Sequence, residues 1–355
     1  MWIKSNSLSG TARRQSEEQL DSAVMHNELD LNPAKLSRLR RALLRWYERN
    51  RRDLPWRRDA DPYHVWVSEI MLQQTRVAAV LGHYARFMRR FPTVRALAVA
   101  RESSVLAVWS GLGYYHRARR MHQAAKLIVR ERLGDFPSTA QDWLTLPGIG
   151  RYTAAAIASI AFGEVVAAVD GNVERVLGRM FGPAIGREGV WLRADALLDR
   201  KRPGDFNQAM MELGATLCTP RAPQCPQCPL NHWCQARGAE VLQPQAPRKR
   251  KTLHYALVEK NDSVLLVQRP ADASLMAEMW ELPGLPENTW NGNEPLARLW
   301  HSITDTDYEV FVMAASLDDL RDFDASARWF SCKQWNRLAL TGLTRKVLSK
   351  VRDES

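Results

Sequence analysis

The 355-residue chain contains no uninterrupted run of about 18 apolar residues, the length that a membrane-spanning helix needs, so we expect no membrane association. Its N-terminal residues are polar and lack the apolar segment of a secretory signal, which favours a cytoplasmic protein. Cysteine is scarce, and the count of 5 is odd, which argues against the disulfide framework of a secreted protein.

The charge balance is basic rather than neutral. Lysine and arginine number 50 against 39 aspartates and glutamates, a formal net charge of +11. This excess favours a polyanionic partner, although alone it is a weak signal. The length allows two domains, each with its own core.

Residues 1–33 are polar, show little periodicity and are expected to be a disordered extension. A helix is predicted from about Lys35 to Asn50, because its leucines recur on one face. A second helix is predicted from Pro62 toward Thr75, since proline is favoured in the first turn. Within it Glu69 has apolar neighbours, which would bury its carboxyl group and raise the pKa. A lone glutamate on a helix is more often a solvated surface group.

Residues 144–172 predict a helix, a glycine hairpin and a second helix. Pro147, Gly148 and Gly150 form the turn, and the alanine-rich segment after it is a strong helix former. The free N–H groups at the start of such a helix can bind a phosphate of DNA. Asp170 follows in an Asp-Gly-Asn turn. An ordinary helical hairpin and a local turn aspartate are the alternative interpretation.

Four of the cysteines lie close together in the sequence. Cys218, Cys225, Cys228 and Cys234 give the spacing C-x6-C-x2-C-x5-C, which predicts a closed thiolate cage. Zinc would also suit four thiolates, and the spacing alone leaves the metal open.

The composition changes after the cysteines. Residues 239–252 are rich in proline, glutamine and basic residues and are expected to be a linker. Strands are predicted over 254–260 and 263–269 around an Asn-Asp turn, and the pattern over 280–284 and 308–313 continues an α+β domain.

Four segments of the sequence resemble known protein families. The segments LPGIGRYTA and VDGNVERVLGR resemble the helix-hairpin-helix DNA glycosylases, and DPYHVWVSEIMLQQTRV and WSGLGYYHRAR are similar to the MutY-type adenine glycosylases. The resemblance implies a mainly α glycosylase fold over 34–238, with a six-helix barrel part over about 54–163 and an iron–sulfur part over 34–53 plus 164–238. A smaller α+β Nudix-like domain would occupy 253–355. It also implies a [4Fe-4S] cluster on the four cysteines.

The resemblance assigns roles to residues as well. Glu69 is the expected catalytic acid and Asp170 the stabilising anion, with Tyr152 hydrogen-bonded near Asp170. Adenine contacts are expected from Arg57, Glu212 and Asn172. The glycines, tyrosines and basic residues of 109–119 suit a DNA wedge with cations for phosphates. The expected DNA-contacting residues are Gln74, Thr75, Leu112, Tyr114, Gly148, Gly150 and Thr304.

The residue after the hairpin bears on the reaction type. Lyase members of the superfamily carry a lysine there, whereas this chain has Tyr152, which cannot form a Schiff base. We therefore expect a monofunctional enzyme that flips adenine out of the duplex and hydrolyses its N-glycosidic bond. Two alternatives stay open: removal of thymine from T·G pairs, and a non-catalytic iron–sulfur DNA-binding protein.

The C-terminal segment VLLVQRP…MWELPG resembles a Nudix-like fold without the acidic Nudix box, which argues against pyrophosphatase activity. In the family this domain reads 8-oxoguanine through a loop that here matches His301-Ser302-Ile303-Thr304-Asp305. Only its first histidine and the hydroxyl of Thr304 remain. The expected partner is double-stranded DNA with an A·8-oxoguanine or A·G mispair, bound by a monomer.

Overall fold

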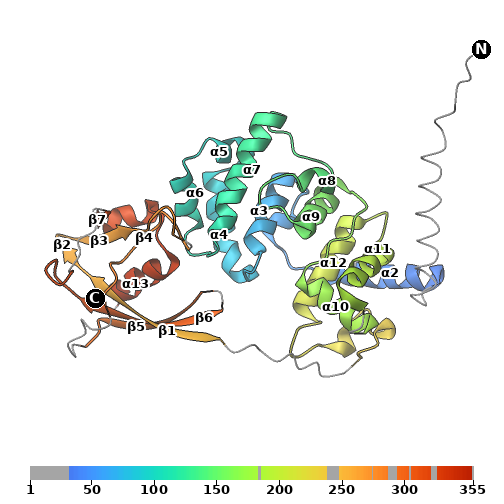
Figure 1. Cartoon of the computed structure of the whole chain (residues 1–355). Coiled ribbons are helices and arrows are strands. Elements are labelled where there is room, and N and C mark those ends of the chain that lie inside the picture. Colours follow the sequence, from blue (N-terminus) through green and yellow to red (C-terminus); the bar gives the residue numbers. More distant parts are fainter. Residues whose placement is uncertain are drawn as a thin grey trace, which may run out of the picture. The chain divides into compact units, whose positions relative to one another are not determined.

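The computed structural model describes residues 32–182, 185–237, 248–273, 275–286, 294–303, 305–320 and 326–353. It is mainly helical with a smaller sheet-containing C-terminal part, as expected (Figure 1). Its contacts define two compact units. Unit 1 comprises Met1–Glu69 and Pro137–Gln243, and unit 2 comprises Ile70–Phe136 and Pro244–Ser355. The domain boundaries expected from the sequence follow a different division and stay a prediction.

Unit 1 is helical. Its core joins Leu39 and Leu43 with Leu177, Leu197 and Leu213, all fully buried. The predicted helix over 35–50 is confirmed, and Asn32 caps it by accepting a hydrogen bond from the N–H of Lys35 at 2.9 Å. The elements are α2 (Pro33–Asn50), η1 (Pro55–Arg57), α3 (Pro62–Leu72, whose end lies in unit 2), α8 (Ala140–Trp143), α9 (Arg151–Phe162), α10 (Gly171–Phe181), α11 (Gly186–Leu197), α12 (Pro203–Thr216), η3 (Cys225–Gln227) and η4 (Asn231–Trp233).

Unit 2 begins with a second group of helices. Phe87 packs edge-on against Phe91 and Trp109, and these three aromatic side chains are buried. The helices are α4 (Val77–Arg90), α5 (Val94–Ala98), α6 (Glu102–Trp109) and α7 (His116–Arg132).

The C-terminal part of unit 2 holds two sheets and α13 (Gly342–Asp353), which packs its leucines and Val347 into the core between them. One sheet has the order β1-β6-β5, with β1 parallel to β6, and the other pairs β3 with β2, β4 and β7. The predicted α+β pattern is confirmed. The strands are β1 (Lys249–Leu257), β2 (Glu259–Lys260), β3 (Ser263–Gln268), β4 (Trp280–Glu281), β5 (Ala297–Ile303), β6 (Thr306–Ala314) and β7 (Ala327–Ser331), with η6 at Cys332–Arg337.

Two details of this part refine the expectations. The Asn261-Asp262 turn has φ values of 48° and 58°, which asparagine and aspartate tolerate, and it joins β2 to β3 as predicted. β1 begins at Lys249, within the stretch expected to be a linker, because its first residues pair with the start of β6.

The helical and sheet-containing parts of unit 2 are joined by hydrogen bonds. The hydroxyl of Ser110 donates to the carbonyl of Leu340 at 2.6 Å and accepts from Nε of Arg345 at 3.0 Å. Arg119 donates to the carbonyl of Ala277 at 2.7 Å. The C-terminal part therefore touches the loop that follows α6.

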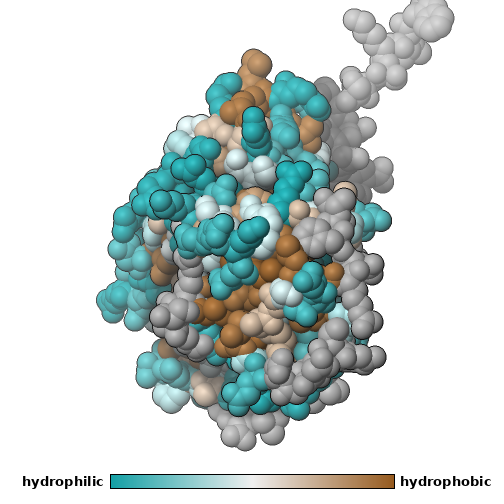
Figure 2. Space-filling view, turned by 90° about the vertical axis from the view of Figure 1, so that its left-hand side faces the viewer, coloured by the Kyte–Doolittle hydropathy of each residue, from teal (hydrophilic) through white to brown (hydrophobic). Residues whose placement is uncertain are grey.

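Figure 2 views the side on which β2 and β7 lie and shows a hydrophobic surface area bordered by polar side chains. On this part of the fold Leu285, Leu320 and Trp329 pack, partly buried, against a small cluster around Leu265. Within the part of the chain that the structure describes, no helix has the length and apolarity needed to cross a membrane.

Candidate active site

Glu69 lies on α3 and is 7% exposed, so the burial expected from its apolar neighbours is confirmed. Its Oε2 accepts a hydrogen bond from the hydroxyl of Tyr152 at 2.6 Å. Burial is the main cause of a pKa of about 7 for Glu69; the hydrogen bond from Tyr152 and the charge of Arg57 oppose the rise, and Asp170 adds to it. A large fraction of this carboxyl group therefore carries a proton near neutral pH.

Tyr152 occupies the first turn of α9, directly after the hairpin. Its hydroxyl contacts Glu69 and lies 3.1 Å from Sδ of Met211, whereas a bond to Asp170 was expected. The phenol instead donates to the carboxyl group of Glu69, while three N–H groups donate to Asp170. Burial, followed by the charges of Glu69 and Asp170, raises the pKa of Tyr152 well above its usual value, so the phenol stays protonated.

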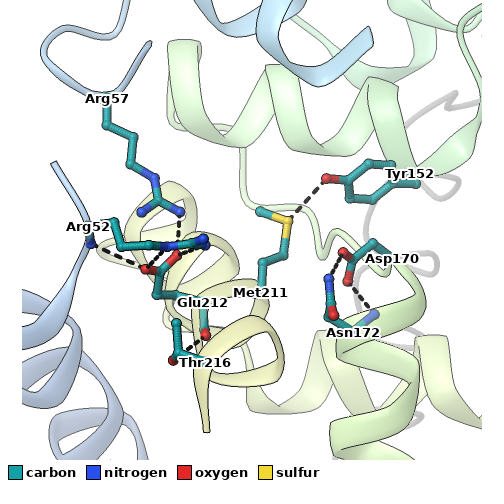
Figure 3. Close-up of polar contacts among 8 residues, drawn as sticks. All are labelled: Arg52, Arg57, Tyr152, Asp170, Asn172, Met211, Glu212 and Thr216. Atoms are coloured by element: carbon teal, nitrogen blue, oxygen red, sulfur yellow. Dashed lines mark hydrogen bonds and ion pairs between the residues drawn. The ribbon is translucent and has the colours of Figure 1, made fainter. Parts of the chain in front are cut away.

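Asp170 is the N-cap of α10 (Figure 3). Its Oδ1 accepts from the backbone N–H groups of Asn172 at 2.9 Å and Val173 at 2.8 Å, and its Oδ2 accepts from Nδ2 of Asn172 at 2.7 Å. Three N–H donors at a helix N-terminus stabilise a negative charge. Asn172, expected to contact adenine, is thus bound to Asp170 and also accepts from Arg175 at 2.9 Å.

Glu212 lies on α12 and is 1% exposed. Arg52 donates to both of its carboxylate oxygens, at 2.7 and 2.8 Å, and Arg57 donates to Oε2 at 2.9 Å (Figure 3). Burial alone would raise the pKa of Glu212, but the hydrogen bonds and charges of the two arginines outweigh it and lower the pKa. Arg57 and Glu212, both expected to contact adenine, are therefore paired with each other here.

Two residues of this region were not singled out from the sequence. Arg52 belongs to the basic loop after α2, but only the fold shows that it reaches Glu212, which is 160 positions away. Met211 precedes Glu212 on α12 and touches the hydroxyl of Tyr152, and the sequence carries no signal for that contact.

The hairpin between α8 and α9 has the predicted form. Gly148 has a φ of +80°, a conformation that glycine adopts without strain. Gly150 is the N-cap of α9, has no side-chain cap, and has open space where a Cβ would lie. No side chain at the N-cap therefore bonds to the first backbone N–H groups of α9. Such N–H groups can donate hydrogen bonds to a phosphate.

The other expected DNA contacts lie in two loops of unit 2. Gln74 is exposed, with a φ of +55°, and Thr75 is half-buried beside it. Leu112 is buried and Tyr114 is half-buried, with a φ of +48°. Thr304, the expected lesion-contacting residue, lies outside the described residues.

The structure corrects one expectation about the basic residues of 109–119. Arg117 was grouped with cations for phosphates, yet it is 5% exposed and donates to backbone carbonyls. Arg119 pairs with Glu102 and Glu278. Both guanidinium groups are therefore bonded within the fold, Arg117 in a buried position and Arg119 in a partly exposed one.

The four cysteines fit a cluster. All four are half-buried and form no disulfide; Cys218, Cys228 and Cys234 pack against the core of unit 1, and Arg179 Nη1 lies 3.2 Å from Sγ of Cys218. Burial raises the pKa of Cys228 to about 11, so its thiolate needs a strong positive charge nearby, which iron supplies. Within the described residues no three His, Cys, Asp or Glu side chains gather tightly enough for a single metal ion.

Comparison with known families defines the class. Residues 67–185 match the HhH-GPD superfamily of base excision DNA repair proteins, and residues 218–234 match the iron–sulfur binding domain of endonuclease III. A thermostable thymine-DNA glycosylase aligns with 57% of this chain and 96% of its own, with a TM-score of 0.54 and 29% identity. The chain is thus an iron–sulfur DNA glycosylase of the helix-hairpin-helix class, and its cofactor is a [4Fe-4S] cluster.

Whole-chain relatives specify the family. The mouse adenine DNA glycosylase is 36% identical over 99% of this chain and 85% of its own. The human enzyme is 38% identical over 81% of this chain and 64% of its own length. The enzyme of Buchnera aphidicola is 29% identical over 86% of this chain and 96% of its own length. The chain belongs to the adenine DNA glycosylase family, which acts on DNA in base excision repair.

Proposed function

We propose that this enzyme removes adenine paired with 8-oxoguanine or guanine and that it is monofunctional, leaving an abasic site. The observation that supports this most is the group formed by the buried Glu69 with the half-buried Tyr152 and Asp170. It combines a carboxyl group of raised pKa with a carboxylate held by three N–H donors. Two carboxyl groups in opposite protonation states are the usual machinery for breaking a glycosidic bond.

In the proposed reaction the adenine is first flipped out of the duplex. Glu69 donates its proton to a ring nitrogen of the purine, and the N-glycosidic bond breaks, with its electron pair going to the base. Asp170 stabilises the positive charge that develops on the sugar. Glu69, now ionised, takes a proton from water as the water oxygen bonds to the anomeric carbon, which restores the acid.

The hydroxyl of Tyr152 orients Glu69 by donating to one oxygen, which leaves the other for the proton that is transferred. Arg57 and Glu212 are proposed to contact the adenine, and Arg52 holds Glu212 ionised for that purpose. Cys218, Cys225, Cys228 and Cys234 hold the [4Fe-4S] cluster, which when bound cross-links the loop after α12.

Base release from matched duplexes tests the substrate. We expect single-turnover release of adenine from A·8-oxoguanine and A·G duplexes and no release of thymine from T·G. Thymine release at a rate comparable to adenine would instead support the T·G alternative. Absence of any release by iron-loaded protein that binds the same duplexes would support a non-catalytic DNA-binding protein.

Borohydride trapping tests the absence of lyase activity. Tyr152 cannot form an imine, so we expect no covalent adduct between the wild-type enzyme and DNA through this position, and Tyr152→Lys can supply the amine that is missing. A strong adduct with the wild-type enzyme would contradict the monofunctional assignment.

Recognition of 8-oxoguanine is proposed to involve Thr304. Its hydroxyl can accept from the N7–H that distinguishes 8-oxoguanine from guanine. One net hydrogen bond is worth roughly 0.5–1.5 kcal/mol, so Thr304→Val should narrow the preference for A·8-oxoguanine over A·G by about tenfold or less. An unchanged preference in this variant would place lesion reading elsewhere.

A further inference from the structure

Arg117 is a cation buried in the first turn of α7. It is 5% exposed, and its guanidinium lies 5.4 Å from the ring centroids of both Trp109 and Tyr114. Burial lowers its pKa to about 10, which leaves it charged at neutral pH. Among the described residues no carboxylate forms an ion pair with it. Something other than a counter-charge therefore compensates for its burial.

That compensation comes from backbone carbonyls of two loops. We call residues 73–75, after α3, the first loop and residues 111–114, before α7, the second loop. Nη1 donates to the carbonyls of Ile70 at 2.8 Å and Met71 at 3.0 Å, which lie in the last turn of α3, and to that of Gln73 at 2.5 Å. The cation thus satisfies the free carbonyls and the negative end of the helix dipole.

The same guanidinium reaches the second loop. Nη2 donates to Oγ1 of Thr75 at 3.2 Å and to the carbonyls of Gly113 at 3.2 Å and Leu112 at 3.4 Å. Nε donates to the carbonyl of Tyr114 at 3.4 Å. A single planar group therefore links both loops, which lie about 40 residues apart in the sequence.

Both loops hold strained backbone. Gln74 and Tyr114 have φ values of +55° and +48°, which cost free energy for residues with a Cβ. Such conformations persist only where the surrounding structure fixes them, and the carbonyls beside them are those that Arg117 binds. Gln74, Thr75, Leu112 and Tyr114 are also the residues of these loops that we expect to contact DNA.

We propose that Arg117 is a positioning residue for adenine removal: it fixes the first and second loops relative to each other so that both engage the distorted duplex together. This inference rests on the proposed function. Arg117 itself touches neither the reacting atoms nor a phosphate. Lysine cannot replace it, because a single ammonium with three donors cannot span the acceptors of both loops.

Arg117→Lys tests the proposal, with Arg119→Lys as the matched control. Arg119 lies two residues further along α7 and bonds outside both loops, to Glu102, Glu278 and the carbonyl of Ala277. The measurements are single-turnover adenine release at saturating enzyme, fluorescence of 2-aminopurine placed beside the target adenine, and thermal stability. All use the iron-loaded full chain and an A·G duplex.

For Arg117→Lys we expect adenine release to slow by about tenfold or more, and the 2-aminopurine signal of base flipping to fall. Misplaced contacts far from the reacting atoms can slow a reaction to this extent. The midpoint of the pH profile, which reports Glu69, should not move, and cooling should not restore the rate. Arg119→Lys should retain the wild-type rate and signal. A wild-type rate in folded Arg117→Lys, or an equal loss in Arg119→Lys, would overturn the proposal.

Hydrogen exchange without DNA tests the link independently of activity. Thr75→Val removes one acceptor of Arg117 in the first loop and keeps the side-chain shape. We expect faster amide exchange in the second loop, at residues 111–114. Exchange that changes only at residues 73–75 would refute the link even if Arg117→Lys does not fold. If wild-type protein released no adenine, the proposed function would fail while this measurement would still decide the role of Arg117.

Discussion

Among the residues of unit 1 that the structure describes, two glutamates are buried, and their carboxyl groups have pKa values shifted in opposite directions. Glu69 is 7% exposed, receives one hydrogen bond from a neutral phenol, and has a pKa of about 7. Glu212 is 1% exposed, receives hydrogen bonds from two arginines, and has a lowered pKa. Two glutamates that are both almost fully buried thus become a largely protonated acid in one place and a fixed anion in the other, and the partners decide which.

The difference decides which glutamate can transfer a proton. A carboxyl group with a pKa near the working pH can both give and take a proton, as general acid catalysis requires. A carboxylate held by two guanidinium groups has no proton to give, but it keeps the loop after α2 attached to α12.

The largest effect is expected at Glu69. Glu69→Gln keeps the shape but removes the transferable proton, so adenine release should fall by roughly 10²-fold or more. Single-turnover kinetics at saturating enzyme measures this, with Glu174→Gln, an exposed glutamate on α10, as the control. A near wild-type rate in Glu69→Gln would remove Glu69 from the mechanism.

The same variant carries a stability prediction of known sign. A carboxyl group whose pKa is raised on folding contributes stability below its unfolded pKa of about 4.5 and loses it as pH rises through about 7. Glu69→Gln should therefore gain about 1–3 kcal/mol relative to wild type between pH 5 and pH 8. Denaturant unfolding at both pH values measures it, and no gain would mean that Glu69 is not protonated in the fold.

Asp170 comes next. Asp170→Asn retains an oxygen that can cap α10, because asparagine caps as well as aspartate does, but it loses the charge. Release should fall by roughly 10²-fold while the melting temperature changes little. Asp170→Ala should lose the rate and also about 1 kcal/mol of stability. Equal rates for Asp170→Asn and wild type would show that the anion is not needed.

The sequence predicts the surroundings of Glu69 and Glu212 only where the interacting residues are close together in the chain. The burial of Glu69 follows from Val65, Trp66 and Ile70 around it, because helix periodicity is local. The position of Asp170 in a turn follows from the adjacent residues in the same way. The bond from Tyr152 to Glu69 and those from Arg52 to Glu212 span 83 and 160 residues, and local patterns carry no information about them. The inward direction of Arg117 is missed for the same reason.

Glu212 should show the opposite behaviour to Glu69. Glu212→Gln leaves two arginines without their anion, and we expect a loss of about 2–3 kcal/mol, less than for a fully buried pair because Arg52 is partly exposed. Its lowered pKa means that the contribution is present above the unfolded pKa and is lost as pH falls, so the loss should shrink in acid. Glu48→Gln, which breaks an exposed pair with Arg202, is the control and should cost less than about 1 kcal/mol. Equal losses for the two variants would contradict the distinction.

The smallest effect is expected at Tyr152. Its hydroxyl lowers the pKa of Glu69 and so partly opposes the effect of burial. Tyr152→Phe should therefore move the pH midpoint of adenine release upward, with a rate at low pH only a few-fold below wild type, the size expected for one lost hydrogen bond of about 1 kcal/mol. The direction is decisive because a tyrosine acting as the proton donor would behave differently: its removal would abolish release at every pH and leave no midpoint to shift. A downward shift would mean that the phenol stabilises the protonated acid instead of opposing the effect of burial.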